Sequence, residues 1–308
     1  MFSVLFPGQG SQSVGMAKDL HDNFKYIKDL FNEADDALNM SISKLIFEGP
    51  KELLNETENT QPAIFLVSYA IFKAIKNETS FDISKASFFA GHSLGEYSAL
   101  ACANVINFKD TIKLLKIRGN AMQNAVPKNE GGMIAILGES IEKIYEIIEH
   151  NKDKFKCFVA NDNSIGQIVV SGKIIDLDKL IIELKKLNIK NVKLAVSAPF
   201  HCALMNSATE VMNRELNNTN LKTPNNEIVS NVTAKPIKDP KEIKNLLIKQ
   251  IEKPVRWRES IINMINNEVD HFIEIGPGKV LSGLIKRINR NVKIDTINSQ
   301  VDIEGLKI

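Results

Sequence analysis

A serine stands between two glycines in the segment FFAGHSLGEYSAL, residues 88–100. The pattern G-x-S-x-G is typical of a nucleophile elbow, a sharp strand-to-helix turn that presents the serine oxygen at the edge of a sheet. A short apolar run before it and helical spacing after it fit that structure, and the first N–H groups of the helix could hold an oxyanion. Ser93 is therefore a candidate nucleophile. The other interpretation is a chance motif in which Ser93 caps a helix.

A serine hydroxyl needs a base to take its proton, and the chain has five histidines. His201 follows Ala-Pro-Phe, which predicts a turn, and precedes a helical segment, so we expect it on a loop. His271 lies beside Asp270 and late in the chain, as esterases of the α/β-hydrolase type require. His92 adjoins Ser93, and its side chain should point away from the serine oxygen. The residues alone leave both His201 and His271 open.

The hydrophobic pattern predicts the elements that position these residues. Short apolar runs bounded by turn residues indicate strands, and apolar spacing of three to four residues indicates helices. The predicted strands are 2–6, 86–90, 227–231 and 271–278, and the predicted helices include 16–40, 61–76 and 108–125. Thr60 is expected to cap the second of these helices, with Pro62 in its first turn.

Residues 126–198 show a different pattern, in which strand, helix, strand, strand, helix and strand follow one another. This βαββαβ order is typical of ferredoxin-like folds. We therefore predict an α/β protein with two domains. Residues 1–125 and 199–308 form a large α/β-hydrolase-like domain with a parallel sheet and the nucleophile elbow, and residues 126–198 form an inserted ferredoxin-like domain.

Composition excludes several classes of protein. The chain has 308 residues, 44% of them hydrophobic and 25% charged, as in ordinary globular proteins. A formal net charge of +2 gives no case for a nucleic-acid partner. Three cysteines without a CxxC pair predict neither a disulfide framework nor a metal site. The N-terminus is typical of a first strand rather than of a signal peptide, and no apolar run reaches membrane-spanning length, so we expect a cytoplasmic protein.

Ten short motifs, spread along nearly the whole chain, resemble those of the malonyl-CoA:acyl carrier protein transacylases and occur in that family's order. They are LFPGQGSQ (5–12), NTQPA (59–63), GHSLGEYSAL (91–100), RG (118–119) with Met122-Gln123, GGMIAILG (131–138), NSIGQIVVSG (163–172), SAPFHCALM (197–205), NVTAKP (231–236), PVRW (254–257) and EIGPGKVLSGL (274–284). The chain departs from the family where Ile165 replaces a proline of Asn-Ser-Pro, which concerns the rigidity of a loop.

The resemblance implies a mechanism with named residues. Ser93 is the nucleophile and His201 its general base. The backbone N–H groups of Leu94 and Gln9 form the oxyanion hole, and the glycines beside Gln9 suit a close backbone approach. The carbonyl of Gln250 orients His201 in place of an acidic residue.

The resemblance also implies the substrate. Arg118 would hold the malonyl carboxylate bidentately, although the residues alone leave it open as a surface arginine. Met122 would line the same pocket, and Phe200 would disfavour an α-methyl group. The implied partners are malonyl-CoA and the phosphopantetheine arm of acyl carrier protein, with no cofactor or metal, and we expect a monomer.

Three alternatives stay open from the sequence. The first is a serine esterase or thioesterase that uses Ser93 and His271. The second is an acyltransferase unit of a polyketide-type synthase, against which the self-contained start and end of the chain argue. The third is a non-catalytic module that binds carrier protein.

Carrier proteins are acidic, and residues 235–258 hold an excess of basic side chains that could meet them. The stretch has eight Lys or Arg residues against three acidic ones. A solvated helix face is the alternative interpretation of these lysines.

Overall fold

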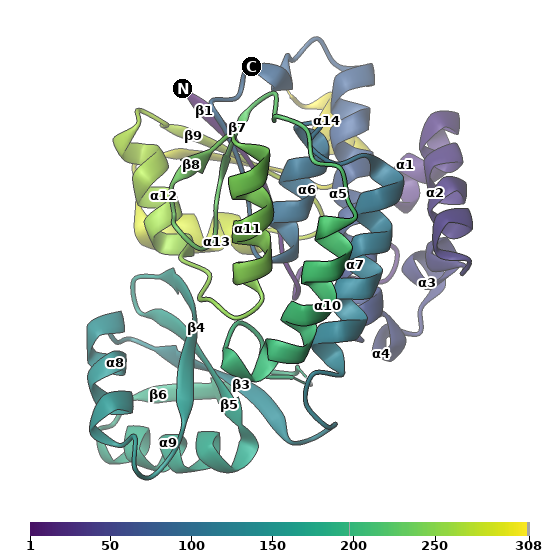
Figure 1. The fold of residues 1–308 in the computed structure, drawn as a ribbon. Helices are drawn as coiled ribbons and strands as arrows, with labels where there is room; N and C mark the ends of the chain where they lie inside the picture. Colours follow the sequence, from purple (N-terminus) through teal and green to yellow (C-terminus); the bar gives the residue numbers. More distant parts are fainter. Residues whose placement is uncertain (197, 307–308) are drawn as a thin grey trace.

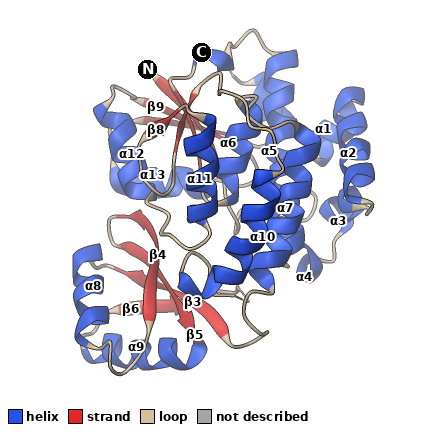
Figure 2. Ribbon diagram, viewed as in Figure 1, coloured by secondary structure: helices blue, strands red, loops and turns tan. Residues whose placement is uncertain are grey.

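Two β-sheets organise the chain, and each is built from a separate part of it (Figure 1 and Figure 2). The computed structural model describes residues 1–196 and 198–306. The first sheet has six strands in the order β10-β9-β1-β2-β7-β8, and the second has four in the order β4-β5-β3-β6. The first sheet contains β1 (Phe2–Phe6), β2 (Phe88–Gly91), β7 (Glu227–Val229), β8 (Pro236–Ile237), β9 (His271–Ile275) and β10 (Lys293–Ile297), and the second contains β3 (Gly131–Leu137), β4 (Cys157–Ser164), β5 (Gln167–Lys173) and β6 (Lys190–Lys193).

The strands of the six-stranded sheet run parallel from β10 to β7, and only the edge strand β8 is antiparallel. Parallel strands are covered on both faces, so they consist of continuous apolar runs rather than alternating ones. The sequence FSVLF of β1 has this character, and residues 3–6 are fully buried. The carboxyl ends of β1 and β2 therefore lie side by side at one edge of a buried sheet.

Helices surround the six-stranded sheet, and they either precede β3 or follow β6 in the chain (Figure 1). They are α1 (Lys18–Asn23), α2 (Lys25–Leu38), α3 (Ile42–Glu48), α4 (Lys51–Leu54), α5 (Thr57–Glu78), α6 (Leu94–Cys102), α7 (Phe108–Gln123), α10 (Asn206–Asn217), α11 (Pro240–Gln250), α12 (Trp257–Asn266), α13 (Val280–Ile288) and α14 (Gln300–Glu304), with short 3₁₀ turns η1 (Ile83–Lys85) and η2 (Ala203–Met205).

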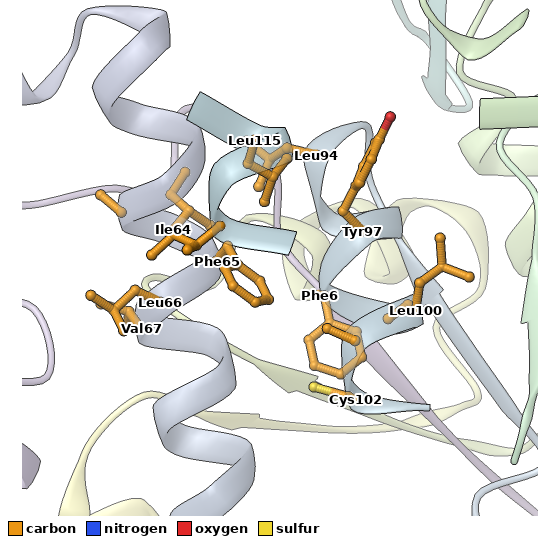
Figure 3. Close-up of a cluster of buried hydrophobic side chains, with 14 of the residues drawn as sticks. Phe6, Ile64, Phe65, Leu66, Val67, Leu94, Tyr97, Leu100, Cys102 and Leu115 are labelled. Carbon is orange, nitrogen blue, oxygen red and sulfur yellow. The ribbon is translucent and has the colours of Figure 1, made fainter. Parts of the chain in front are cut away.

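The core of this part lies between α5, α6 and the sheet. α5 is buried on nearly every face, which explains why its sequence is apolar almost all round rather than on one stripe. Figure 3 shows Phe65 of α5 and Phe6 of β1 together with Leu94 and Leu100 of α6 in this cluster. The helix that follows Ser93 is thus held by apolar packing on both sides.

The four-stranded sheet is antiparallel, with α8 (Ile141–His150) and α9 (Ile174–Lys186) in its chain order of strand, helix, strand, strand, helix and strand. This unit lies below the larger part in Figure 1. Asp162 of β4 joins the two parts, because its carboxylate accepts hydrogen bonds from Arg258 at 2.9 and 3.0 Å. The backbone also bridges them, since the N–H of Asp162 donates to the carbonyl of Val255 at 3.0 Å.

The fold confirms the predicted mixed α/β class with a parallel sheet, and it corrects several boundaries. The helix expected over 61–76 begins at Thr57, so Pro62 lies inside it and Thr60 does not cap it. The hydroxyl of Thr60 instead donates to the carbonyl of Leu54 at 2.6 Å. β10 and the helices α3, α4 and α14 were not predicted. Ser197, the first residue of the SAPFHCALM motif, lies outside the described residues.

Across residues 1–196 and 198–306, the structure contains no helix with the length and apolar character needed to cross a membrane.

Candidate active site

A strained turn carries Ser93 between β2 and α6. Ser93 has φ 55° and ψ −109°, a backbone conformation that residues other than glycine rarely adopt. The turn is tight because two glycines allow backbone to meet backbone. A Cβ on Gly91 would lie 1.9 Å from the carbonyl oxygen of Gly95, and a Cβ on Gly95 would lie 2.2 Å from that of Phe6. This confirms the predicted strand, elbow and helix.

Asn231, in the loop after β7, holds the elbow from the neighbouring strand. Its Oδ1 accepts a hydrogen bond from the Ser93 N–H at 2.7 Å, and its Nδ2 donates to the carbonyl of Gly91 at 2.7 Å. Both partners belong to the turn, so one buried amide fixes the backbone on each side of His92. The Ser93 N–H is consequently engaged, whereas Leu94 is the first residue of α6, where helix N–H groups have no partner within the helix.

His201 contacts Ser93 from the loop that precedes η2. Its Nε2 lies 2.8 Å from the Ser93 Oγ, and its Nδ1 lies 2.8 Å from the main-chain carbonyl oxygen of Gln250. The carbonyl can only accept, so Nδ1 carries the proton and Nε2 is free to accept the serine proton. His201 also has a positive φ of 57°, a backbone conformation that residues other than glycine rarely adopt. The predicted trio of Ser93, His201 and Gln250 therefore comes together.

Burial sets the protonation state of His201. The side chain is only 3% exposed. Burial, with the positive charge of Arg118 as the next cause, lowers the pKa of His201 to about 3. The imidazole is therefore neutral, and able to accept a proton, at neutral and mildly acidic pH.

His271 lies at the opposite end of the sheet. In the parallel register it is level with Phe2 at the start of β1, whereas Gly91, next to the elbow, is level with Phe6 at the end of that strand. Its Nε2 is 2.7 Å from a carboxylate oxygen of Asp295 on the edge strand. This position disfavours the esterase alternative, which needs His271 beside Ser93.

A cavity of about 160 Å³ opens beside Ser93 and His201. Gln9 and Leu94 line it, as do Met122 and Phe200. The residues predicted for the oxyanion hole and those predicted for the acyl pocket therefore line the same cavity. Gln9 lies just after the end of β1 and Leu94 just after the end of β2, which places both loops at the carboxyl edge of the sheet. Ligands of α/β sheets bind at this edge.

Arg118 is fully buried, which excludes the surface position that its sequence left open. Its Nη2 donates to the Ser93 Oγ at 3.1 Å and to the Gln250 Oε1 at 2.9 Å. Its Nη1 donates to the Gln61 Oε1 at 2.7 Å. A guanidinium thus stands against the candidate nucleophile, close enough to meet an anionic group on an acyl chain bound there.

Sequence reasoning missed several residues that build the site. Gln61 holds Arg118, Asn231 holds the elbow, and Glu96 accepts a hydrogen bond from the Gln250 side chain at 2.7 Å. Each lies in a motif that marks the family resemblance, but nothing in a single sequence shows which polar side chain of a motif points inward. The His92 Nε2 donates to the Asn163 Oδ1 of β4 at 2.8 Å, which links the elbow to the second sheet.

Within the described parts of the chain, no three His, Cys, Asp or Glu side chains gather as metal ligands. The three cysteines are buried and free.

Comparisons with known proteins identify the family of this chain. Residues 4–300 match the family described as acyl transferase domain, and the chain belongs to that family. Within it, the chain is similar to proteins named malonyl CoA-acyl carrier protein transacylase. The one from Haemophilus influenzae is 40% identical over 307 residues, which are 99% of this chain and 98% of the relative. The one from Staphylococcus aureus strain MRSA252 is 41% identical over 305 residues, which are 98% of this chain and 97% of the relative.

Solved structures give the same result. The acyl-carrier-protein-S-malonyltransferase of Bartonella henselae superimposes with a TM-score of 0.95 at 42% identity, over 99% of this chain and 97% of that one. A malonyl-transacylase solved in complex with its type II polyketide synthase acyl-carrier protein superimposes with a TM-score of 0.94 at 37% identity, over 98% and 97% of the two chains.

The contact between Gly95 and the Phe6 carbonyl predicts a large effect of one methyl group. We expect Gly95→Ala to lower the free energy of unfolding by about 3 kcal/mol, since neither backbone segment can move without breaking the elbow. Gly283→Ala is the matched control. Gly283 lies inside helix α13, and a Cβ added to it would meet nothing within 4 Å. We expect that variant to be about 0.5–1 kcal/mol more stable. Urea denaturation measures both, and equal effects would contradict the packing argument.

The lowered pKa of His201 predicts how the reactivity of Ser93 depends on pH. An ordinary histidine of pKa 6.5 would lose about tenfold of its basic form between pH 8 and 5.5. Because the pKa of His201 is about 3, we expect the rate of Ser93 labelling by an uncharged fluorophosphonate to fall less than about twofold across that range. His201→Ala should label slowly at every pH. An inflection near pH 6.5 would show that His201 is not held neutral.

Proposed function

We propose that this protein transfers the malonyl group of malonyl-CoA to the phosphopantetheine thiol of acyl carrier protein, through a malonyl-Ser93 intermediate, for fatty acid synthesis. One observation carries the proposal. The Ser93 Oγ lies 2.8 Å from a neutral, correctly oriented imidazole and 3.1 Å from a fully buried guanidinium. The first contact serves acyl transfer and the second serves an acyl group that ends in a carboxylate. The likeness to named transacylases supports the same function.

In the first half-reaction, His201 Nε2 takes the proton of Ser93 as its Oγ attacks the malonyl thioester carbonyl. The carbonyl oxygen becomes an oxyanion, and the N–H groups of Leu94 and Gln9 are the proposed donors to it. The imidazolium that forms is held by the Gln250 carbonyl at 2.8 Å. His201 then returns the proton to the departing CoA sulfur, which leaves malonyl-Ser93.

The second half-reaction reverses these steps. The thiol of the carrier protein's phosphopantetheine arm enters the place that CoA has left, and His201 takes its proton as the sulfur attacks the ester of malonyl-Ser93. The same two N–H groups hold the second oxyanion. Collapse of this intermediate breaks the bond to the Ser93 Oγ, which takes back the proton, so the exchange is ping-pong and needs no cofactor or metal.

Arg118 would select the acyl group by its charge. A guanidinium offers two parallel N–H donors to a carboxylate. The malonyl carboxylate would replace the weaker neutral acceptors that Arg118 now contacts. Met122 and Phe200, both buried in the cavity wall, would limit the size of the group next to the carbonyl.

We also propose the finer fold assignment and the setting of the protein. The large part, residues 1–125 and 199–308, is α/β-hydrolase-like, and the inserted part, residues 126–198, is ferredoxin-like. The separate sheets and the strand order β4-β5-β3-β6 support this division. In this proposal the protein works as a cytoplasmic monomer.

The basic stretch over residues 235–258 supports the acidic partner less strongly than its composition suggests. Three of its cations are neutralised within the chain, since Lys238, Arg256 and Arg258 form ion pairs with acidic side chains. Lysines on and beside α11, among them Lys241, Lys249 and Lys253, remain exposed. These are the positions at which a carrier protein would meet positive charge.

The experiment that tests the function follows the acyl group by mass. The protein is mixed with malonyl-CoA or with acetyl-CoA, and intact mass and peptide mapping locate the adduct. We expect a malonyl adduct on Ser93 that holo acyl carrier protein discharges, with the malonyl group appearing on the carrier. Discharge to water alone would instead support a thioesterase, and transfer only to a polyketide-type carrier would change the pathway served.

Arg118 generates a prediction about selectivity. We expect Arg118→Ala to lower kcat/KM for malonyl-CoA about a hundredfold, because a charge-assisted contact of about 2–3 kcal/mol is lost. Activity with acetyl-CoA should change much less. Arg118→Lys keeps the charge but not the fork, and it should fall between the two. Retention of the malonyl preference by Arg118→Ala would remove Arg118 from the proposal.

A further inference from the structure

Glu96 is a buried acid beside the site for which the proposed mechanism has no use. It is the third residue of α6 and only 1% exposed. One of its oxygens, Oε2, accepts hydrogen bonds from the Gln250 Nε2 at 2.7 Å and from the Asn231 N–H at 3.2 Å. An acid at such depth is costly unless it has a structural or electrostatic role.

In the described part of the chain, Arg118 is a buried cation that has no carboxylate in direct contact. It is a fully buried cation whose hydrogen-bond acceptors are all neutral: the Gln61 Oε1, the Ser93 Oγ and the Gln250 Oε1. Its guanidinium also lies over the ring of Tyr97, 5.5 Å from the centroid. A buried charge without a counter-charge is strongly destabilising. Among the described residues, Arg118 forms no salt bridge with a carboxylate, unlike Arg258, which pairs with Asp162.

The side chain of Gln250 joins the two groups. Its Nε2 donates to Glu96 at 2.7 Å, and its Oε1 accepts from Arg118 at 2.9 Å. A carboxylate at one end polarises the amide, so that the oxygen at the other end carries more negative charge toward the guanidinium. The orientation of the amide is fixed as well, because the carboxylate accepts only from its NH₂ end.

We propose that Glu96 is the internal counter-charge of Arg118, relayed by the Gln250 amide, and that it competes with the substrate carboxylate for that cation. Glu96 is thus a positioning residue that tunes specificity. The inference rests on the proposed function only in taking the malonyl carboxylate as the anion that Arg118 binds.

Glu96 is also the group near Arg118 that titrates around neutral pH. Burial raises the pKa of Glu96 to about 7, against the opposing effects of Asn231, Gln250 and Arg118. The other ionisable groups beside Arg118 lie far from this range, because burial lowers the pKa of His201 to about 3 and raises that of Tyr97 to about 12.

The elements packed against α6 add no other buried charge. They are α5, α7, β1, β2 and β7. The strands β1 and β2 contain no ionisable side chain, and Glu227 at the start of β7 pairs with Lys238 at 3.3 Å. Of the charged side chains on α5 and α7, Arg118 alone is buried. Burial also lowers the pKa of His92, which precedes the elbow.

Competition between two anions for one cation has a thermodynamic signature. When Glu96 is protonated, Arg118 has its full charge for the substrate carboxylate; when Glu96 is ionised, that charge is already balanced. Carboxylate binding must therefore raise the pKa of Glu96, and by linkage it must take up protons near neutral pH. Affinity for the carboxylate should then fall as the pH rises through 7.

The probe is malonamate, which carries one carboxylate that stays ionised above pH 6 and an amide that does not acylate Ser93. Calorimetric titration of the intact protein between pH 6 and 8.5 gives the Kd. We expect the Kd of the unmodified protein to rise about tenfold over this range, as a one-unit shift in a coupled pKa requires. Parallel titrations in phosphate and in Tris at pH 7.5 should reveal net proton uptake.

Glu96→Gln isolates the charge. Both hydrogen bonds of Glu96 go to one oxygen, so the amide oxygen of glutamine can accept them in the same place. We expect Glu96→Gln to bind malonamate as tightly at pH 8.5 as at pH 6, without proton uptake. Glu274→Gln is the matched control, since Glu274 is also a buried acid whose pKa burial raises. That variant should keep the pH dependence of the unmodified protein.

Two results would overturn the inference. One is an unchanged pH dependence in Glu96→Gln, and the other is binding without proton uptake by the unmodified protein, which needs no variant to fold. The proposed function fails separately, through the absence of a malonyl adduct that carrier protein discharges. A protein that binds malonamate with the expected pH dependence but transfers no malonyl group would retain the counter-charge and lose the function.

Discussion

The backbone contact between the first turn of α6 and the end of β1 is the constraint on which the rest of the site depends. Gly95 lies so close to the Phe6 carbonyl that a side chain has no room between them. This contact brings the start of α6 over the carboxyl edge of the sheet. Ser93 is then forced into a strained conformation, and Leu94 and Gln9 line the same cavity. Apolar packing of α6 against α5 holds the strain.

The second sheet and the loop that follows it also contribute residues to the site. His201 lies on the loop that returns from it, and Asn163 of β4 contacts His92 beside the nucleophile. Asp162 and its backbone link to Val255 tie the same strand to the segment just beyond Gln250. The candidate base therefore lies between both parts of the chain, and its acceptor, Gln250, is the last residue of α11.

Several strands and the turn at Ser93 could be predicted from local sequence pattern, whereas the start of α5 and the buried charged residues could not. β1 occurs at the predicted residues 2–6 because a short apolar run that ends at a proline leaves little choice. The elbow was predictable because G-x-S-x-G has a steric cause. The start of α5 was misplaced because tertiary burial extends that helix before Pro62. Arg118 and Glu96 could not be placed, since a charged residue on a helix is usually exposed and only the assembled core shows otherwise.

The acceptor that orients His201 is a main-chain oxygen, and every amino acid supplies one. No substitution at position 250 removes that carbonyl as long as α11 ends where it does. Orientation of the base is thereby insulated from mutational drift, in contrast to a triad whose third member is a side chain. The side chain of Gln250 remains available for a second contact, in which its Oε1 accepts a hydrogen bond from Arg118 at 2.9 Å. Gln250 therefore makes two independent contacts in the site. Its backbone carbonyl orients His201, and its side chain contacts Arg118, so a substitution can change the second contact and keep the first.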